Sequence, residues 1–202
     1  MKTGPRYKIA KRLGASVFEK TQTQKFAIAQ ERTAKNRRRG RRLSDYGKQL
    51  LEKQKVRVTY GITERQFSNY VHTASQTHGT GAVATLHQLL EMRLDNVAYR
   101  IGLAPTRRAA RQMVAHGHIT INGRRTMIPS RQVHLSDRIA VREGSRSRVL
   151  FANFADTFSE SPLPSWLSWD PKKMEGGIKE SPTVDSADPA GDLGAVLSFY
   201  SR

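Results

Sequence analysis

Apolar residues recur with helical spacing from about residue 44 onward. Ser44 is a good N-cap for a first helix, which we expect to end at Gly61. Thr63, followed three residues later by Gln66, forms a capping-box pair and predicts the start of a second helix. Its apolar residues fall at positions i, i+3, i+4 and i+7: Phe67, Tyr70, Val71 and Ala74. These two helices present an apolar stripe that has to be buried.

Two further helical segments follow. Leucines continue an apolar stripe from Leu86 to Ile101, but Asp95 interrupts it, so the run predicts two helices that meet near Arg93. Thr106 is the expected N-cap of a later helix that Gly117 ends. The inward residues of that helix are Ala109, Ala110, Met113 and Val114. Its arginines should therefore lie on the opposite side.

The periodicity then changes from helical to extended. Residues 118–121 alternate and lead into Asn122-Gly123, the strongest short signal for a β-hairpin. Further short strands are expected at 132–135 and 138–142. Residues 166–170, 176–179 and 195–200 are compatible with short strands or strand-like tails, and 180–194 with a loop. Helices followed by short antiparallel strands indicate the α+β fold class.

The first 35 residues have weak periodicity. Ile9, Leu13, Val17 and Phe18 provide at most one short helical face. We interpret this segment as part of a basic extension that becomes ordered on a binding partner. No stretch has the length or apolar character of a signal peptide or a membrane helix, and the chain has no cysteine. These features predict a soluble intracellular protein without a disulfide framework.

Charge is the most informative part of the composition. The 202 residues include 35 Lys and Arg against 17 Asp and Glu, a formal net charge of +18. Residues 1–60 hold 18 basic and 4 acidic side chains, whereas residues 151–202 hold 4 basic and 8 acidic ones. Such a gradient predicts that one part of the protein faces a polyanion. The pattern is typical of a component of a larger assembly.

The densest basic cluster lies in residues 36–42, where five of seven residues are arginine. Arginine matches phosphate oxygens with its planar fork, so a nucleic-acid partner would neutralise this cluster. The alternatives are a solvated disordered arm or a localisation signal.

A second basic group is expected around the helix that Thr106 caps. Arg107, Arg108 and Arg111 lie near its N-terminus, where free N–H groups and the helix dipole attract phosphate. Arg124 and Arg125 follow the hairpin turn, and in a compact module they would continue the same basic ridge. The alternative is that these arginines are only solvated surface residues.

No motif for catalysis is found. The sequence contains no nucleophile elbow, P-loop, dinucleotide fingerprint or paired-carboxylate context. His116 and His118 are two residues apart, but no cysteine or carboxylate cluster accompanies them, so they do not predict a metal site. We expect no enzyme activity, no cofactor, no metal and no small-molecule substrate.

Several long segments resemble one family, the bacterial-type small-subunit ribosomal protein four. They include LSDYGKQLLEKQKVRVTYG from Leu43, LLEMRLDNVAYRIG from Leu89, TRRAARQMVAHGHITINGR from Thr106 and the terminal FYSR. The HGHITINGR stretch alone is similar to the S-four RNA-binding domain, which also occurs in pseudouridine synthases, tyrosyl-tRNA synthetases and rRNA methyltransferases. The order of the matches favours the ribosomal family over a non-ribosomal RNA-binding or RNA-modifying factor.

The resemblance implies a domain organisation and a function. It implies a basic extension (1–42), a helical domain (43–91), an inserted S-four module of two helices and short strands (92–155), and a carboxy-terminal segment (156–202) that packs on the helical domain. Such proteins bind 16S-type rRNA at a junction in the 5′ domain, nucleate assembly of the small-subunit body, and contact small-subunit protein five at an interface linked to decoding accuracy. By position, Arg38, Arg39, Arg41 and Arg42 match residues that line the mRNA entrance.

The chain departs from the family in its first third and near its end. The metal-binding cysteine cluster of many members is missing, and Glu31 to Asn36 replace the usual Pro-Gly-Gln-His-Gly turn. Residues 180–194 are also more acidic than expected. The resemblance implies a cytoplasmic ribosome, with an organellar one left open.

These patterns together predict the RNA-contacting residues. Tyr46 is equally compatible with stacking on RNA and with packing. The predicted contacts are Arg37, Arg38, Arg39, Arg41, Arg42, Tyr46, Lys48, Lys53, Lys55, Arg57, Arg65, Arg93, Arg100, Thr106, Arg107, Arg108, Arg111, Gln112, His116, His118, Asn122, Arg124 and Arg125.

Overall fold

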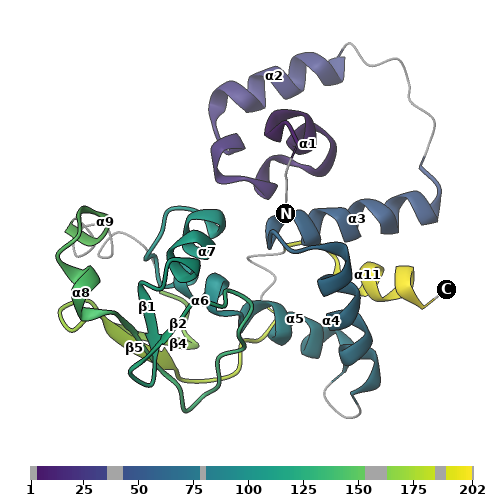
Figure 1. The fold of residues 1–202 in the computed structure, drawn as a ribbon. Coiled ribbons are helices and arrows are strands. Elements are labelled where there is room, and N and C mark those ends of the chain that lie inside the picture. Colours follow the sequence, from purple (N-terminus) through teal and green to yellow (C-terminus); the bar gives the residue numbers. More distant parts are fainter. Residues whose placement is uncertain (1–3, 36–42, 78–80, 153–162, 185–189, 202) are drawn as a thin grey trace. The chain divides into compact units, whose positions relative to one another are not determined.

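A computed structural model describes residues 4–35, 43–77, 81–152, 163–184 and 190–201 (Figure 1). The chain divides into two compact units. Residues 1–86 and 185–202 form the first, which we call the helical unit, and residues 87–184 form the second, the sheet unit. Helix α5 (Ala82–Glu91) runs from one unit into the other. The α+β fold class predicted from the sequence is confirmed.

The helical unit consists of α-helices and two short 3-10 turns. Its elements besides α5 are α1 (Arg6–Leu13), η1 (Ala15–Val17), η2 (Glu19–Thr21), α2 (Gln24–Lys35), α3 (Asp45–Thr59), α4 (Glu64–Gln76) and α11 (Leu193–Tyr200). The predicted caps are present: the Ser44 hydroxyl accepts from the Gly47 N–H (3.2 Å), and the Thr63 hydroxyl accepts from the Gln66 N–H (3.4 Å). Local sequence therefore fixed the starts of α3 and α4.

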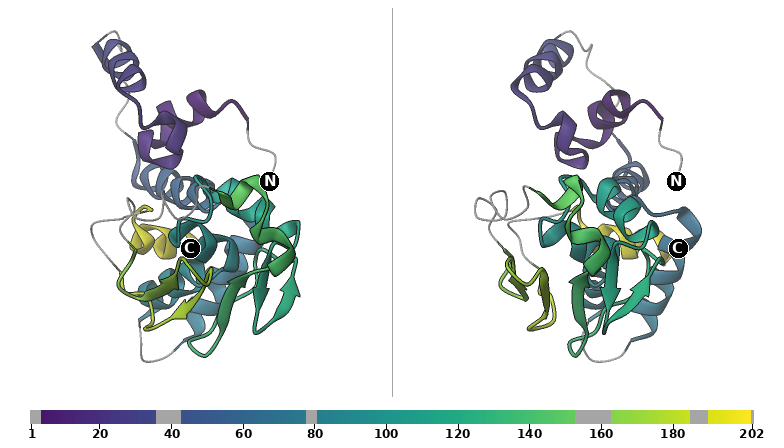
Figure 2. Two further views of the ribbon diagram at one scale, coloured as in Figure 1. Left: turned by 90° about the vertical axis from the view of Figure 1, so that its left-hand side faces the viewer. Right: turned by 60° about the vertical axis from the view of Figure 1, so that its left-hand side comes forward.

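The amino-terminal segment differs from the expected unstructured extension. Within residues 4–35, α1, the 3-10 turns and α2 fold back on one another, as Figure 2 shows from two sides. Ala10, Val17 and Phe26 are buried there, and the rings of Tyr7 and Phe26 lie 5.9 Å apart. The apolar residues are distributed over two helices and two tight turns, so no single helical stripe reveals them.

The carboxy-terminal end forms helix α11, where we expected a strand at 195–200. The Asp192 side chain caps it by accepting from the Ala195 N–H (3.0 Å), and the helix packs on α3 and α4. A short, uniformly apolar run has no periodicity that separates strand from helix. The Tyr200 hydroxyl donates to Glu64 of α4 (2.7 Å), and the Lys53 ammonium donates to the same carboxylate oxygen (2.6 Å).

The sheet unit has helices on one face of a five-stranded antiparallel sheet. The strand order is β2-β1-β3-β5-β4. Its elements besides α5 are α6 (Leu94–Arg100), α7 (Arg107–Ala115), β1 (Ile119–Ile121), β2 (Arg124–Thr126), β3 (Arg138–Val141), α8 (Glu143–Arg146), α9 (Val149–Ala152), β4 (Leu167–Asp170) and β5 (Glu175–Ile178). Apolar residues of α6 and α7 pack against Ile119, Ile121, Ile139 and Val141 of the strands to form its core.

The predicted domain boundary at residue 156 is wrong. Strand β5 pairs with β3, with Gly176 opposite Ile139, so β4 and β5 extend the sheet of the S-four module. Trp169 and Ile178 join the core of that module. A Cβ atom on Gly176 would lie 1.9 Å from the Ser168 carbonyl oxygen, which explains the glycine in this strand. Of the described residues after 156, residues 163–184 belong to the sheet unit and only residues 190–201 belong to the helical unit.

Of three local predictions, two are confirmed and one is wrong. The hairpin turn is confirmed, with left-handed backbone at Asn122 (φ 52°) and Gly123 (φ 77°). The helix break near Arg93 is also confirmed, because α5 ends at Glu91 and α6 begins at Leu94. The strand at 132–135 is wrong: Gln132 makes only an isolated bridge to Arg93.

Replacing Tyr200 with Phe should weaken the attachment of α11. The change removes the hydrogen bond to Glu64, which is a charge-assisted bond near the surface, so the free energy of unfolding should fall by about 1 kcal/mol. Urea denaturation measures it. Tyr46→Phe is the matched control, because no described hydrogen bond involves the Tyr46 hydroxyl; equal effects of the two variants would contradict the role of the Tyr200 bond.

The same cluster should make stability depend on pH. Burial raises the pKa of Glu64, but hydrogen bonds from Lys53 and Tyr200 and the charges of Lys53 and Arg57 outweigh it, so the net pKa is lowered. A lowered folded pKa means stabilisation that is present above the unfolded pKa and is lost as the pH falls through the folded pKa. The unfolding free energies of wild type and Glu64→Gln should therefore converge between about pH 6 and about pH 3. A difference that stays constant over this range would contradict the pKa shift.

Candidate nucleic-acid interface

Helix α7 presents its polar side in two strips. The Thr106 hydroxyl accepts from the Ala109 N–H (3.1 Å) and caps the helix as predicted, which leaves N–H groups of the first turn facing outward. Ala110, Met113 and Val114 are buried in the core. Arg108, Gln112 and His116, spaced four residues apart, are exposed and form one strip; Arg107 and Arg111 are partly buried and form the other.

The second strip is attached to α6. Arg107 Nε donates to Asn96 Oδ1 (2.9 Å), and its guanidinium carbon lies 4.4 Å from the centre of the Tyr99 ring. Arg111 donates to Asp95 Oδ2 at 3.4 Å. These contacts fix the position of both guanidinium groups while leaving part of each exposed. Both arginines are thus held in place for an anion that approaches α7.

Two of the arginines predicted to contact RNA are paired with buried carboxylates instead. The Arg93 side chain is fully buried and bonds Asp95 with two nitrogens, at 3.0 and 2.7 Å. Arg100 places both arms of its fork on Glu91, each at 2.9 Å, and Asn96 donates to the same carboxylate. Arg93 therefore cannot contact RNA, and the prediction was wrong. A buried arginine needs a buried partner, and here Asp95 supplies it.

The hairpin arginines point to opposite faces of the sheet. In the strand register, Arg124 lies opposite Ile121, which faces the helices, whereas Arg125 lies opposite Thr120, which faces away from them. Arg125 donates to the His116 carbonyl oxygen (3.0 Å). Its side chain passes over Gly117, where a Cβ atom would lie 2.1 Å from Arg125 Nε, so only glycine leaves room for it.

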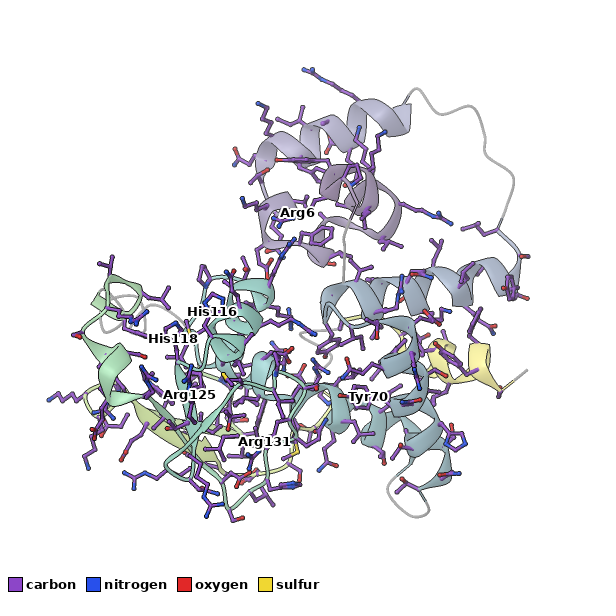
Figure 3. All side chains as sticks on the ribbon, viewed as in Figure 1. Arg6, Tyr70, His116, His118, Arg125 and Arg131 are labelled. Atoms are coloured by element: carbon purple, nitrogen blue, oxygen red, sulfur yellow. The ribbon has the colours of Figure 1, made fainter. Side chains whose placement is uncertain are left out.

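Arg125 therefore meets α7 at its carboxy-terminal end. Figure 3 shows His116, His118 and Arg125 gathered there, with Arg131 apart from them. Arg107 starts the same helix, nine residues long and thus about 13 Å in length. The basic ridge that we expected to be continuous is therefore divided between the N-terminal and the carboxy-terminal ends of α7.

His118 is a structural residue, whereas His116 is exposed. His118 is 9% exposed, and its Nδ1 lies 3.0 Å from the Ser145 hydroxyl oxygen. Burial lowers the pKa of His118, and the surrounding cations, Arg148 foremost, lower it further. A neutral buried ring is a poor phosphate ligand, which argues against the predicted RNA contact. Within the described ranges, no three His, Asp or Glu side chains are placed to hold a metal ion.

Asn122 also has a structural role. Its side-chain amide donates to Asp137 Oδ1 (2.7 Å), and its carbonyl oxygen accepts from the Arg138 N–H (2.8 Å). These bonds tie the hairpin turn to the start of β3. The Asn122 side chain is exposed, but its hydrogen-bonding groups are engaged.

In the helical unit, Lys53 was wrongly predicted to contact RNA. It is 7% exposed, its ammonium is paired with Glu64, and it lies 4.4 Å from the centre of the Phe199 ring. Arg57 is partly buried beside it, 3.5 Å from Glu64 and 2.7 Å from Gln54. A sequence pattern places both on the polar side of α3, but α11 covers that side.

The other basic residues of α3 and α4 remain near the surface. Lys48 pairs with Asp45 (2.9 Å) and Lys55 with Glu52 (3.7 Å), both one turn apart along the helix. Arg65 is exposed and has no bonded partner in the described parts of the chain. The Lys48–Asp45 pair is exposed and therefore weak, so Lys48 and Arg65 are available to a phosphate, whereas the Lys55–Glu52 pair is partly buried.

Tyr46 packs on α11 and is partly exposed. Its ring lies 5.4 Å from the ring of Phe199, while 51% of the residue is exposed. The predicted contacts at residues 37–42 lie outside the described residues.

Sequence reasoning missed several cations that the structure makes prominent. Arg138, Arg142 and Arg146 surround one hollow of the sheet unit. The alternation of β3 could have placed Arg138 on the outer face of the sheet, whereas Arg142 and Arg146 follow that strand at α8. On α1, Lys8, Lys11 and Arg12 are also exposed, and a helical assignment for residues 6–13 would have placed them.

Known proteins match this chain along nearly its whole length. The small ribosomal subunit protein uS4 of Herpetosiphon aurantiacus is 44% identical over 209 residues, covering 99% of this chain and 98% of its own. Those of Roseiflexus castenholzii (43% over 206 residues, 98% of each chain) and Ralstonia pickettii (44% over 207 residues, 99% of this chain and 98% of its own) are similar. The chain belongs to the uS4 family.

Two family models divide the uS4 chain near the start of α6. The Ribosomal protein S4/S9 N-terminal domain matches residues 1–91, and the S4 domain matches residues 92–139. The resemblance noted from the sequence is thereby confirmed. Proteins of the uS4 family are structural and are not enzymes, which agrees with the expectation for this chain. No helix in the described parts has both the length and the apolar character to cross a membrane.

Asp95→Asn should destabilise the sheet unit strongly. It leaves the fully buried Arg93 guanidinium without its charged partner, so the free energy of unfolding should fall by about 3 kcal/mol or more in urea denaturation. Asp45→Asn is the control, because it breaks only the exposed pair with Lys48 and should have little effect. A small effect of Asp95→Asn would show that the buried pair is not required.

Proposed function

We propose that this protein is a structural component of the small ribosomal subunit and binds 16S-type rRNA through the α7 side of its sheet unit. The observation that carries the proposal is the arrangement of cations at the capped start of α7. Arg108 is exposed and unpaired among the described residues, and Arg107 and Arg111 beside it are held by α6. Folded RNA is recognised mainly through phosphates and 2′-hydroxyls, which suits spaced, preoriented guanidinium groups.

The names of the uS4 relatives support the ribosomal part of the proposal. The resemblance further supports binding at a junction in the 5′ domain, nucleation of the body of the subunit, a contribution to decoding accuracy, and contact with small-subunit protein five. The basic residues of 36–42 would contribute to the mRNA entrance. We infer that the protein acts in cytoplasmic ribosomes. Co-sedimentation of the protein with small subunits in a ribosome profile tests this placement.

Arg108→Ala should weaken rRNA binding and lower its dependence on salt. Loss of one phosphate contact should reduce the slope of log affinity against log salt by about 0.7 to 0.9. Filter binding with a transcript of the 16S-type 5′ domain, repeated at several salt concentrations, measures the slope.

Lys172→Ala is the matched control for Arg108→Ala. Lys172 is an exposed cation of the same unit that lies in the turn between β4 and β5, so its loss should leave the slope unchanged. A slope that is the same for wild type and Arg108→Ala would exclude a phosphate contact at the start of α7.

A further inference from the structure

The sheet unit has a second polar face, on the side of the sheet away from α6 and α7. Along β1, Ile119 and Ile121 point into the core, and Thr120 between them points to the opposite side. Ala140 of β3 lies opposite Thr120 and faces the same way. We call this side the open face. Arg125 of the edge strand β2 belongs to it as well, because it also lies opposite Thr120.

The open face is hollowed. A pocket of about 630 Å³ is lined by residues that include Thr120, Ala140 and three arginines, Arg138, Arg142 and Arg146. Arg138 lies on β3, Arg142 follows that strand directly as the N-cap residue of α8, and Arg146 is the last residue of α8. The three cations converge from two different elements on one pocket.

The pairing of these cations leaves charge available. Arg142 is partly buried, yet its side chain makes no hydrogen bond or ion pair with the described residues. Arg146 uses only its Nε, which donates to the Val141 carbonyl oxygen (3.2 Å). Arg138 pairs with Glu175, but 68% of its side chain is exposed. A partly desolvated guanidinium without a partner, facing a hollow, indicates an anion that binds there.

We propose that this pocket binds the sugar–phosphate backbone of a second RNA segment, so that the sheet unit contacts RNA on both sides of its sheet. The inference rests on the proposed rRNA-binding function and adds a separate site to it. Because the sheet lies between α7 and the open face, a single RNA strand cannot bind both without wrapping around the unit. Two segments of a folded RNA fit this geometry.

The residues around the pocket favour RNA over an acidic protein partner. They include no aromatic or methionine side chain, which protein interfaces use at their centres. They instead include three arginines, a residue type that commonly contacts phosphate. Glu143 and Glu175 also lie at the pocket and limit its positive charge, so we expect a few phosphate contacts there.

Arg142→Ala in the full-length protein tests the proposal with a transcript of the 16S-type 5′ domain. Loss of one phosphate contact at about 0.1 M salt should raise the dissociation constant roughly five- to eightfold and lower the salt slope by about 0.7 to 0.9. Arg142→Lys should retain most of the binding because it keeps the charge, and Lys172→Ala should behave as wild type. Thermal unfolding of each variant must match that of wild type for the comparison to count.

Hydroxyl-radical footprinting separates the two faces. Arg142→Ala should expose one set of riboses and Arg108→Ala a different set, whereas loss of the same riboses in both variants overturns the two-sided arrangement. Wild-type affinity in Arg142→Ala, together with weakened binding in Arg108→Ala, overturns the pocket but leaves the proposed function intact. Failure of the wild-type protein to bind the transcript overturns both.

Discussion

The buried carboxylates Glu91 and Asp95 determine which arginines of the sheet unit can bind anything else. Each lies under the turn between α5 and α6 and is at most 4% exposed. A carboxylate in such a place requires a cation, and a cation beside it is no longer free for a ligand. Arg93 and Arg100 neutralise this layer, and Arg111 touches its edge. The Arg107–Arg111 strip of α7 therefore rests on a layer whose charges are already neutralised.

The same layer connects the helices to the hairpin. The backbone N–H groups of Leu94 and Asp95 open helix α6 and donate to the carbonyl oxygens of Arg131 and Pro129, at 2.9 and 3.0 Å. The loop after β2 thus caps a helix that carries the buried carboxylate. A negative charge at a helix N-terminus is also favoured by the helix dipole. Hairpin, α6 and α7 are in this way fixed as one rigid surface.

Sequence reasoning succeeded where a few neighbouring residues decide the structure. The caps at Ser44, Thr63 and Thr106 and the turn at Asn122 were predicted because their chemistry is local. It failed where burial in the tertiary fold decides. Arg93 and Arg108 are indistinguishable in a pattern of cations, but one meets Asp95 in the core and the other meets solvent.

Longer-range pairing was equally hidden in the sequence. The strands β4 and β5 were predicted as strands, yet their neighbour could not be, because extended residues alternate in the same way whichever sheet they join. For α11 a signal was present: Asp192, three residues before Ala195, is an N-cap that favours helix over strand. The pocket arginines come from β3 and from the α8 segment, and no local pattern predicts that these residues line one hollow.

Arginine thus serves two purposes in this protein, and salt distinguishes them. Pairs such as Arg93 with Asp95 lie out of reach of dissolved ions, so salt screens them little. Exposed guanidinium groups such as that of Arg108 interact with charges through water, and at 0.1 M salt these interactions are largely screened beyond about 10 Å. Rising salt therefore weakens the attraction for RNA while the charged layer under α6 keeps the surface in shape. A binding surface built this way releases its ligand without unfolding.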